Sequence, residues 1–283
     1  MEKNFVKLLT KDKEIRLFLV DATKALERSH IHEMKTDEAR RLYTNIFIHC
    51  CLLSGFLTEV DQRINVSIRF QPEGYTAFCD VNGRGQVNCV FSPQLAAFTG
   101  DFVDLLGDRA SLSISRGSWR EGMFTGTVEM KATSIDACFS YFYSKSEQIK
   151  TIFRTWIKDG VARGCLIQPL PFSHLDRLQL ILDQLDRSTN EIVSAKWTEL
   201  PTRIFPDANK VDEYVVLSEC NCTKEMFVGM LMSLESEELQ KSIKAGKWEE
   251  LECGICGRKY RFGVDDLRRI VKMKERGQSE SVS

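Results

Sequence analysis

Two short stretches near the C-terminal end, residues 219–222 (ECNC) and 252–257 (ECGICG), each carry a close pair of cysteines. Thirty residues separate the two pairs. Two such pairs on separate loops can enclose one tetrahedral zinc ion, with Zn–S bonds of about 2.3 Å. The sequence therefore predicts a four-cysteine site for one zinc ion per chain. The predicted ligands are Cys220, Cys222, Cys253 and Cys256.

Four thiolate ligands close the coordination shell and leave no position for a catalytic water. The site is therefore expected to be structural or regulatory, not hydrolytic. Gly254 and Gly257 suit the tight turns of the second loop. The first pair is C-x-C, where zinc ribbons usually have C-x-x-C, and cysteines that close can form a disulfide once the metal leaves. A bare dithiol redox pair remains an alternative. The basic residues expected to offset the thiolate charge are Lys224, Arg258, Lys259 and Arg261.

The other six cysteines lie singly or as one pair in apolar runs such as FCDV and NCVF. We interpret them as small buried hydrophobic residues. A static disulfide framework is not expected in a reducing compartment, and whether any of them joins the redox chemistry stays open. They are Cys50, Cys51, Cys79, Cys89, Cys138 and Cys165.

The bulk composition is that of an ordinary globular protein. Of 283 residues, 43% are hydrophobic and 28% are charged, and the formal net charge is -1. This balance gives no global attraction to nucleic acid or to an anionic membrane. The N-terminus lacks a secretory apolar run, and the longest apolar stretch, residues 46–57, is too short to cross a bilayer. We expect a soluble cytoplasmic protein that binds no membrane.

Residues 1–171 mix strand and helix signals and are predicted to form an α+β core domain. Thr36 is a plausible N-cap for a long amphipathic helix. Hairpin turns are expected at residues 82–85 (NGRG) and 158–160 (KDG). The expected strands cover residues 15–20, 63–70, 75–81, 86–91, 111–115 and 123–130.

Residues 172–213 are predicted to be a helical linker region. Apolar residues recur every three or four positions in residues 173–190, where Ser173 and Asp176 resemble a capping box. A second helical stretch covers roughly residues 191–200. An amphipathic linker needs a surface to cover. It either packs permanently on the first domain or serves as a detachable cover over an apolar binding surface.

Residues 214–275 are predicted to form a small zinc domain, followed by a disordered tail at residues 276–283. Residues 224–247 look largely helical and would bring the two cysteine loops together. Between Arg258 and Arg276, basic residues outnumber acidic ones by eight to three. This patch keeps a zinc-dependent nucleic-acid or partner-binding protein as an alternative.

The cysteine arrangement and its surroundings resemble the thirty-three-kilodalton heat shock protein family, bacterial redox-regulated chaperones. The resemblance covers most of the chain and is strongest at the C-terminus. One departure is Arg163-Gly164, where the family has a doubled glycine. The stretches that carry the resemblance are DVNGRGQV (80–87), FTGTVEM (124–130), YFYSKSEQ (141–148), GCLIQPLP (164–171), CNCTKEMF (220–227) and ECGICGRKYRFGVDDL (252–267).

The resemblance implies an ATP-independent holdase whose reduced, zinc-bound form is inactive. Oxidation would form Cys220–Cys222 and Cys253–Cys256 disulfides, release zinc, unfold the linker and expose an apolar surface to unfolded client proteins. The oxidised form would be able to form a homodimer. No enzyme is expected, because the four histidines are scattered and no Walker A, G-x-S-x-G or dinucleotide-binding fingerprint is present.

Overall fold

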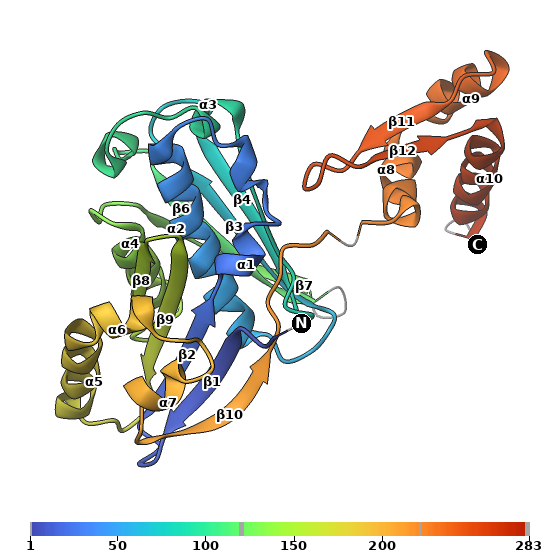
Figure 1. Cartoon of the computed structure of the whole chain (residues 1–283). Coiled ribbons are helices and arrows are strands. Elements are labelled where there is room, and N and C mark those ends of the chain that lie inside the picture. Colours follow the sequence, from blue (N-terminus) through green and yellow to red (C-terminus); the bar gives the residue numbers. More distant parts are fainter. Residues whose placement is uncertain (1, 119–121, 221, 281–283) are drawn as a thin grey trace. The chain divides into compact units, whose positions relative to one another are not determined.

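The computed structural model describes residues 2–118, 122–220 and 222–280. The chain folds into two compact units, Met1–Glu219 and Cys220–Ser283, which are described separately (Figure 1). Both units combine helices with antiparallel sheets, which confirms the predicted α+β class. None of the helices in the described ranges has the length and apolar character that a membrane span requires.

One five-stranded sheet of the N-terminal unit has the order β10-β1-β2-β9-β8, and all its strand pairs are antiparallel. Neighbouring side chains point to opposite faces, so Phe18 joins one apolar core and Leu19 joins another. The predicted turn before β9 is present, with positive φ at Asp159 and Gly160. The strands are β1 (Phe5–Thr10), β2 (Ile15–Asp21), β8 (Ile152–Lys158), β9 (Val161–Pro169) and β10 (Ala208–Tyr214).

The second five-stranded sheet has the order β5-β4-β3-β6-β7 and is also antiparallel. The predicted turn between β4 and β5 is confirmed. Asn82 Oδ1 accepts hydrogen bonds from the backbone N–H groups of Arg84 and Gln86, and Gly85 adopts a φ of 76°. The strands are β3 (Gln62–Arg69), β4 (Thr76–Asn82), β5 (Val87–Phe91), β6 (Ser111–Ser118) and β7 (Gly122–Glu129).

Helix α2 (Asp37–Leu53) packs against strands of both sheets and forms the centre of the larger core. The predicted cap is present, since the Thr36 hydroxyl accepts a hydrogen bond from Ala39 N–H at 3.1 Å. Helix α4 (Ile135–Lys145) packs against α2 and β8. The short helices of this part are α1 (Thr23–Leu26), η1 (His30–Glu33), η2 (Ser54–Phe56), α3 (Pro93–Ala96) and η3 (Phe102–Leu105).

The segment predicted as a helical linker contains three helices, α5 (Leu175–Arg187), α6 (Thr189–Ser194) and α7 (Leu200–Ile204). The expected capping box is absent. The N-cap of α5 is His174, without a side-chain cap, and its backbone N–H donates to Glu14 at 2.8 Å. The segment is also not wholly helical, because β10 begins within it and pairs with β1.

The C-terminal unit has a two-stranded sheet and a core of nine buried residues, two of which are cysteines. Helix α10 continues through Glu280, into the segment expected to be disordered, and residues 281–283 lie outside the described part. The elements are η4 (Lys224–Phe227), α8 (Val228–Ser233), α9 (Ser236–Lys244), β11 (Glu249–Glu252), β12 (Lys259–Phe262) and α10 (Val264–Glu280).

The six cysteines of the N-terminal unit are all buried, as predicted. The sequence predicts no disulfide framework and leaves their part in redox chemistry open; the structure pairs two of the six. Cys79 and Cys89 lie directly opposite each other on β4 and β5 and form a disulfide. The two cysteines are ten residues apart in sequence, and the short turn between β4 and β5 sets the antiparallel register that brings them together.

Candidate metal centre

The four predicted ligands meet in the C-terminal unit. Cys220 and Cys222 precede η4, and Cys253 and Cys256 lie in the turn between β11 and β12. All four Sγ atoms lie within 4.8 Å of one another. Cys222 and Cys253 are buried, whereas Cys220 and Cys256 are half-buried. The cluster is thus at the edge of the small core, within reach of solvent.

The turn between β11 and β12 places its two sulfurs on one side. Cys253 N–H donates to Arg258 C=O, and Gly257 N–H donates to Cys253 C=O, each at 2.9 Å. Gly257 adopts a φ of 67°, which a residue with a side chain rarely does. Gly254 has no such constraint, since an added Cβ would meet no atom within 4 Å. Only Gly257 meets the expectation from sequence.

The spacing of the sulfurs suits a tetrahedral metal ion. With metal–sulfur bonds of about 2.3 Å, the sulfurs at the corners of a tetrahedron lie about 3.8 Å apart. The Sγ atoms of Cys220 and Cys253 are 3.8 Å apart, and those of Cys222 and Cys256 are 3.3 Å apart. A donor set of four thiols at these distances could hold one metal ion without rearrangement of the backbone.

Tyr260 on β12 is a neighbour that the sequence analysis assigned no role. Its hydroxyl donates to Cys222 C=O at 2.5 Å and lies 3.1 Å from Cys222 Sγ. Burial raises the pKa of the Cys222 thiol, but hydrogen bonds from Tyr260 and the other thiols outweigh it and lower this pKa to about 7. Burial raises the pKa of Cys220 and Cys256. One sulfur is therefore favoured as the thiolate.

The basic residues expected to offset thiolate charge mostly have other partners. Lys224 pairs with Asp266 at 2.6 Å, and Lys259 and Arg261 both pair with Glu250. Only Arg258 remains associated with the cluster. Its pKa is raised by a hydrogen bond with Tyr260, and then by the charges of Tyr260, Cys222 and Cys256.

A second candidate surface is the interface between the linker helices and the first sheet. Side chains from β1, β2 and β9 form one apolar core with side chains from α5, α6 and α7. On the sheet side the buried residues are Val6, Leu8, Ile15, Leu17, Leu19, Cys165 and Ile167. On the linker side they are Leu178, Ile181, Leu185, Ile192, Leu200, Ile204 and Phe205. The linker thus covers an apolar sheet face, as the sequence indicated.

Arg163 fastens this cover by polar contacts. Its side chain is only 8% exposed and donates from Nε to the Asp21 carboxylate at 2.8 Å. Its Nη1 donates to Ile192 C=O at 2.6 Å and to Ala195 C=O at 2.9 Å. These carbonyls lie in and just after α6, whose last carbonyl groups have no partners within the helix. In the sequence, Arg163 stands out only as a departure from the family's doubled glycine.

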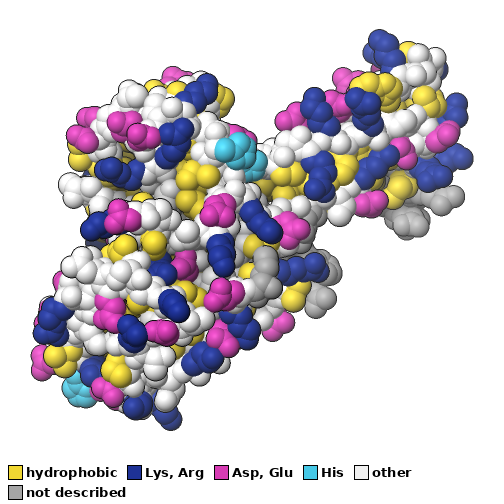
Figure 2. Space-filling view, in the orientation of Figure 1, with side chains coloured by type: hydrophobic (Ala, Val, Ile, Leu, Met, Phe, Trp, Pro, Cys, Tyr) yellow, Lys and Arg dark blue, Asp and Glu magenta, His cyan; other side chains and the backbone are white. Residues whose placement is uncertain are grey.

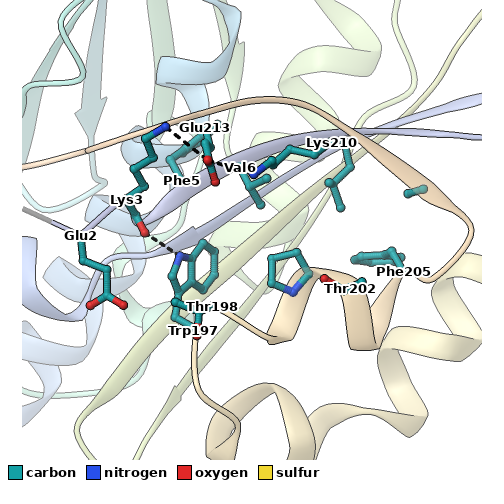
Figure 3. Close-up of a pocket in the computed structure, with 13 residues that line it drawn as sticks. Glu2, Lys3, Phe5, Val6, Trp197, Thr198, Thr202, Phe205, Lys210 and Glu213 are labelled. Atoms are coloured by element: carbon teal, nitrogen blue, oxygen red, sulfur yellow. Dashed lines mark hydrogen bonds and ion pairs between the residues drawn. The ribbon is translucent and has the colours of Figure 1, made fainter.

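The cover is not fully packed near α7. A cavity of about 410 Å³ lies between α7, β1 and β10 (Figure 3). At its edge, Trp197 Nε1 donates to Lys3 C=O at 2.9 Å. Glu213 binds Lys3 at 3.2 Å and Lys210 at 2.9 Å. This end of the linker therefore borders a gap, although Leu200, Ile204 and Phe205 are buried in the core that it shares with the sheet.

Comparison with known proteins gives the family. Residues 4–263 match the family model described as Hsp33 protein. This chain belongs to the Hsp33 family. A 33 kDa chaperonin of Latilactobacillus sakei is 24% identical, over 96% of this chain and 99% of the relative. A 33 kDa chaperonin of Clostridium perfringens is also 24% identical, over 100% of this chain and 96% of the relative.

The fold of the Hsp33 family is also found in a solved structure. The crystal structure of the 33 kDa chaperonin from Thermotoga maritima matches with a TM-score of 0.74 and 18% identity, covering 96% of this chain and 99% of that chain. Membership of the family supports a chaperone role for the chain, and chaperonins are not enzymes. A chaperone role in turn implies binding of unfolded client proteins.

Proposed function

We propose that the chain is a redox-regulated, ATP-independent holdase chaperone. In the reduced form, one zinc ion is bound by Cys220, Cys222, Cys253 and Cys256, and the client-binding surface is covered. In the oxidised form, zinc has left and the linker has unfolded. The observation that carries the proposal is the four-thiol cluster in a unit whose core, among the residues with described side chains, has nine buried members.

The four thiols suit zinc by their chemistry and spacing. A bound zinc ion would hold the sulfurs as thiolates, which are also the forms that oxidants attack. Structural zinc contributes on the order of 10 kcal/mol or more to folding a small module, and a whole domain is stable by only about 5–15 kcal/mol. Loss of the metal would therefore leave the C-terminal unit unable to fold.

The oxidation step balances with peroxide as the oxidant. Two thiolates, two protons from solvent and one hydrogen peroxide give one disulfide and two waters, so two peroxide molecules convert both cysteine pairs and free the zinc ion. The proposed pairs are Cys220–Cys222 and Cys253–Cys256. Without bound zinc, Cys222 would be the first sulfur to react, because the pKa of its thiol is lowered and thiolate is the nucleophile. Its sulfenic acid would then be attacked by the sulfur of Cys220, two residues away.

The path from the cysteines to the linker follows the chain. Glu219, the residue before Cys220, has its carbonyl held by Asn88 Nδ2 at 2.9 Å. Val216 is held through N–H and C=O by the side chain of Asn4, at 2.7 and 2.9 Å. Next come β10 and α7. We propose that unfolding of the cysteine segment strains these few bonds, frees β10 and α7, and then lifts α5 and α6 from the sheet.

The surface that this unfolding exposes would bind clients. It is the apolar face of β1, β2 and β9 together with the apolar stripe of the linker helices. Burial of apolar surface is non-directional, so such a face would accept unfolded chains of many sequences. The functional division follows: a client-binding core at residues 1–171, a linker at 172–213 and a redox switch at 214–275. A cytoplasmic location and a homodimer of the oxidised form belong to the same proposal.

The deciding experiment measures zinc content per chain before and after peroxide at raised temperature. Light scattering from a heat-denatured client is read on the same samples. We expect zinc to leave and scattering to fall together. Retained zinc, or zinc loss without protection of the client, would contradict the proposal.

Nucleic-acid binding is tested on the same samples by the shift of labelled DNA and RNA. On the face of the C-terminal unit drawn in Figure 2, basic side chains are interspersed with acidic and apolar ones. We therefore expect no shift in either redox state. A shift in both states would favour a structural zinc site in a nucleic-acid-binding protein.

A further inference from the structure

A second group of cysteine sulfurs lies in the core of the N-terminal unit. Cys50 on α2, Cys79 on β4 and Cys89 on β5 have Sγ atoms within 4.8 Å of one another, and all three side chains are fully buried. The antiparallel register places Cys79 directly opposite Cys89, with Cα atoms 4.0 Å apart. The structure joins these two as a disulfide and leaves Cys50 as a thiol.

The surroundings favour redox chemistry over metal binding at this group. The three cysteines belong to the apolar core formed by α2 and the second sheet, and they provide one ligand fewer than a closed zinc site requires. Burial alone raises the pKa of the Cys50 thiol far above its ordinary range. Three buried thiolates would be costly in such a core, whereas a disulfide is uncharged and fits it.

We propose that Cys79 and Cys89 are a second redox pair, oxidised independently of the four-cysteine site, and that Cys50 is the thiol able to exchange with it. Oxidation by one hydrogen peroxide converts the two thiols to a disulfide and two waters. The disulfide cross-links β4 to β5, beside helix α2 at the centre of the larger core. The proposal goes beyond the redox switch and does not depend on it.

The two sites differ in when they react. Because the thiols of the core are buried and protonated, peroxide reaches them only when the β4–β5 hairpin opens. Heat or partial unfolding provides that opening, and reclosing then traps the bond in the native register. Oxidation under heat would thus unfold the C-terminal unit and at the same time fasten the N-terminal unit, which must stay folded to hold clients.

Cys50 could exchange with the Cys79–Cys89 disulfide and move the bond to a different pair of cysteines. Attack of its thiolate on the disulfide would form Cys50–Cys79 or Cys50–Cys89 and release the third sulfur as a thiolate, with no net oxidation. Either product would tie α2 to the second sheet. The raised pKa of Cys50 makes this exchange slow while the core stays closed.

Peptide mapping of the full-length protein tests the proposal directly. Reduced protein is treated with hydrogen peroxide at raised temperature, its free thiols are alkylated in denaturant, and it is digested with trypsin. Cleavage after Arg84 separates residues 70–84, which contain Cys79, from residues 85–109, which contain Cys89. We expect the peptide pair linked through these cysteines to become the main form. Residues 211–224 and 248–258 report the switch cysteines, and fragmentation of the peptide 42–63 distinguishes Cys50 from Cys51, which that peptide also contains.

A second measurement does not depend on how well a variant folds. The thermal midpoint of the N-terminal unit is measured with and without dithiothreitol, within each variant. Cross-linking should raise the oxidised midpoint of the wild type by roughly 5 °C. Cys79→Ala and Cys89→Ala, each combined with Cys50→Ala so that no second partner remains, should lose this difference. The matched variant of a buried unpaired cysteine, Cys138→Ala, should keep it.

The linked peptides and the thermal midpoints together decide between the possible outcomes. A linked pair that involves Cys50 would support exchange within the group. Full alkylation of both Cys79 and Cys89 after peroxide and heat, with a midpoint insensitive to dithiothreitol, would overturn the proposal. Zinc content read on the same samples reports the four-cysteine switch, so failure of one site is distinguishable from failure of the other.

Discussion

The two cysteine groups of this chain differ in burial and in the pKa of their thiols, and these differences favour different sulfur chemistry. In the C-terminal unit, four sulfurs lie at the edge of a core of nine buried residues, and the pKa of Cys222 is lowered to about 7. In the N-terminal unit, three sulfurs lie inside a far larger core, where burial raises the pKa of Cys50. On the functions proposed above, the first group would hold its unit together through a bound metal ion, whereas the second would add a bond to a unit that already has a large core.

The largest expected effect tests how far each unit depends on its sulfurs. Cys253→Ser removes one of four ligands and is expected to unfold the C-terminal unit, because structural zinc contributes about 10 kcal/mol or more to such modules. Hydrogen exchange should show loss of protection in residues 222–274 and little change in β3 and β6.

The control is Cys138→Ser, a buried cysteine of the N-terminal unit that belongs to neither group. It should leave the protection of the C-terminal unit unchanged. If Cys253→Ser also left that protection intact, the small unit would be stable without its metal, and the contrast between the two units would be lost.

Local signals in the sequence predicted much of this arrangement. The Thr36 cap, the turn at residues 82–85 and the four cysteines each depend on residues close to one another in the chain or on a simple spacing. The cross-strand pairing of Cys79 with Cys89 could also have been predicted from the turn. Asn82 and Gln86 flank it, Cys79 lies three residues before Asn82, and Cys89 lies three residues after Gln86. The sequence analysis read these two residues only as small hydrophobic side chains.

The features that were missed depend on contacts between distant segments. Strand β10 (ANKVDEY) is charged and exposed, as suits an edge strand, and has no apolar alternation to reveal it. The role of Arg163 depends on Asp21 and on carbonyls near Ile192, which are remote in sequence. The predicted cap at Ser173 is absent. Glu14, from another part of the chain, binds the backbone N–H and the ring of His174, which is the N-cap of α5.

A second prediction loosens the cover without touching either cysteine group. Arg163→Met keeps the length of the side chain but removes its bonds to Asp21 and α6. The cost is expected to be about 3 kcal/mol, because the Asp21 carboxylate, only 16% exposed, loses its charged partner and keeps the hydrogen bond from Thr23 N–H. Hydrogen exchange of residues 189–195 and binding of a hydrophobic dye by reduced protein should both increase, while zinc content stays at one per chain.

The matched control is Arg203→Gln, which breaks ion pairs of the same linker at the surface. Arg203 lies 2.7 Å from Glu199, and its side chain is 54% exposed. Such pairs contribute less than about 1 kcal/mol, so dye binding should stay near that of the wild type. Equal effects of the two variants would mean that the buried contacts of Arg163 are not what fastens the cover.

A third prediction addresses the apolar part of the same cover. Leu185→Ala removes a side chain that is 1% exposed, and should weaken attachment of α5 by about 2–4 kcal/mol. The matched change on the outer side of the helix, Leu180→Ala, alters a side chain that is 54% exposed and should cost less than about 0.5 kcal/mol. Urea unfolding followed by tryptophan fluorescence measures both, since Trp197 lies in the linker.

The smallest effect is expected at the hydroxyl beside the switch. Tyr260→Phe keeps the ring, which packs against Phe227, but removes the donor to the sulfur and carbonyl of Cys222. Neighbours that donate to metal ligands typically change metal affinity 10–100-fold, so zinc affinity should fall by about tenfold, or roughly 1.4 kcal/mol. The pKa of Cys222 should rise, because Tyr260 is the first of the groups that lower it. Competition with a chromophoric chelator measures the affinity.

The control for this variant loses a hydroxyl elsewhere in the same unit. Ser242→Ala removes a hydrogen bond of 2.5 Å to Glu249 and should leave zinc affinity unchanged. A proton binds the Cys222 sulfur more tightly when its pKa is higher, so zinc binding by Tyr260→Phe should weaken further as pH falls. If the affinities of Tyr260→Phe and the wild type stayed equal across pH, the lowered pKa of Cys222 would not come from this hydroxyl. The reactivity of the small unit would then depend on the sulfurs alone.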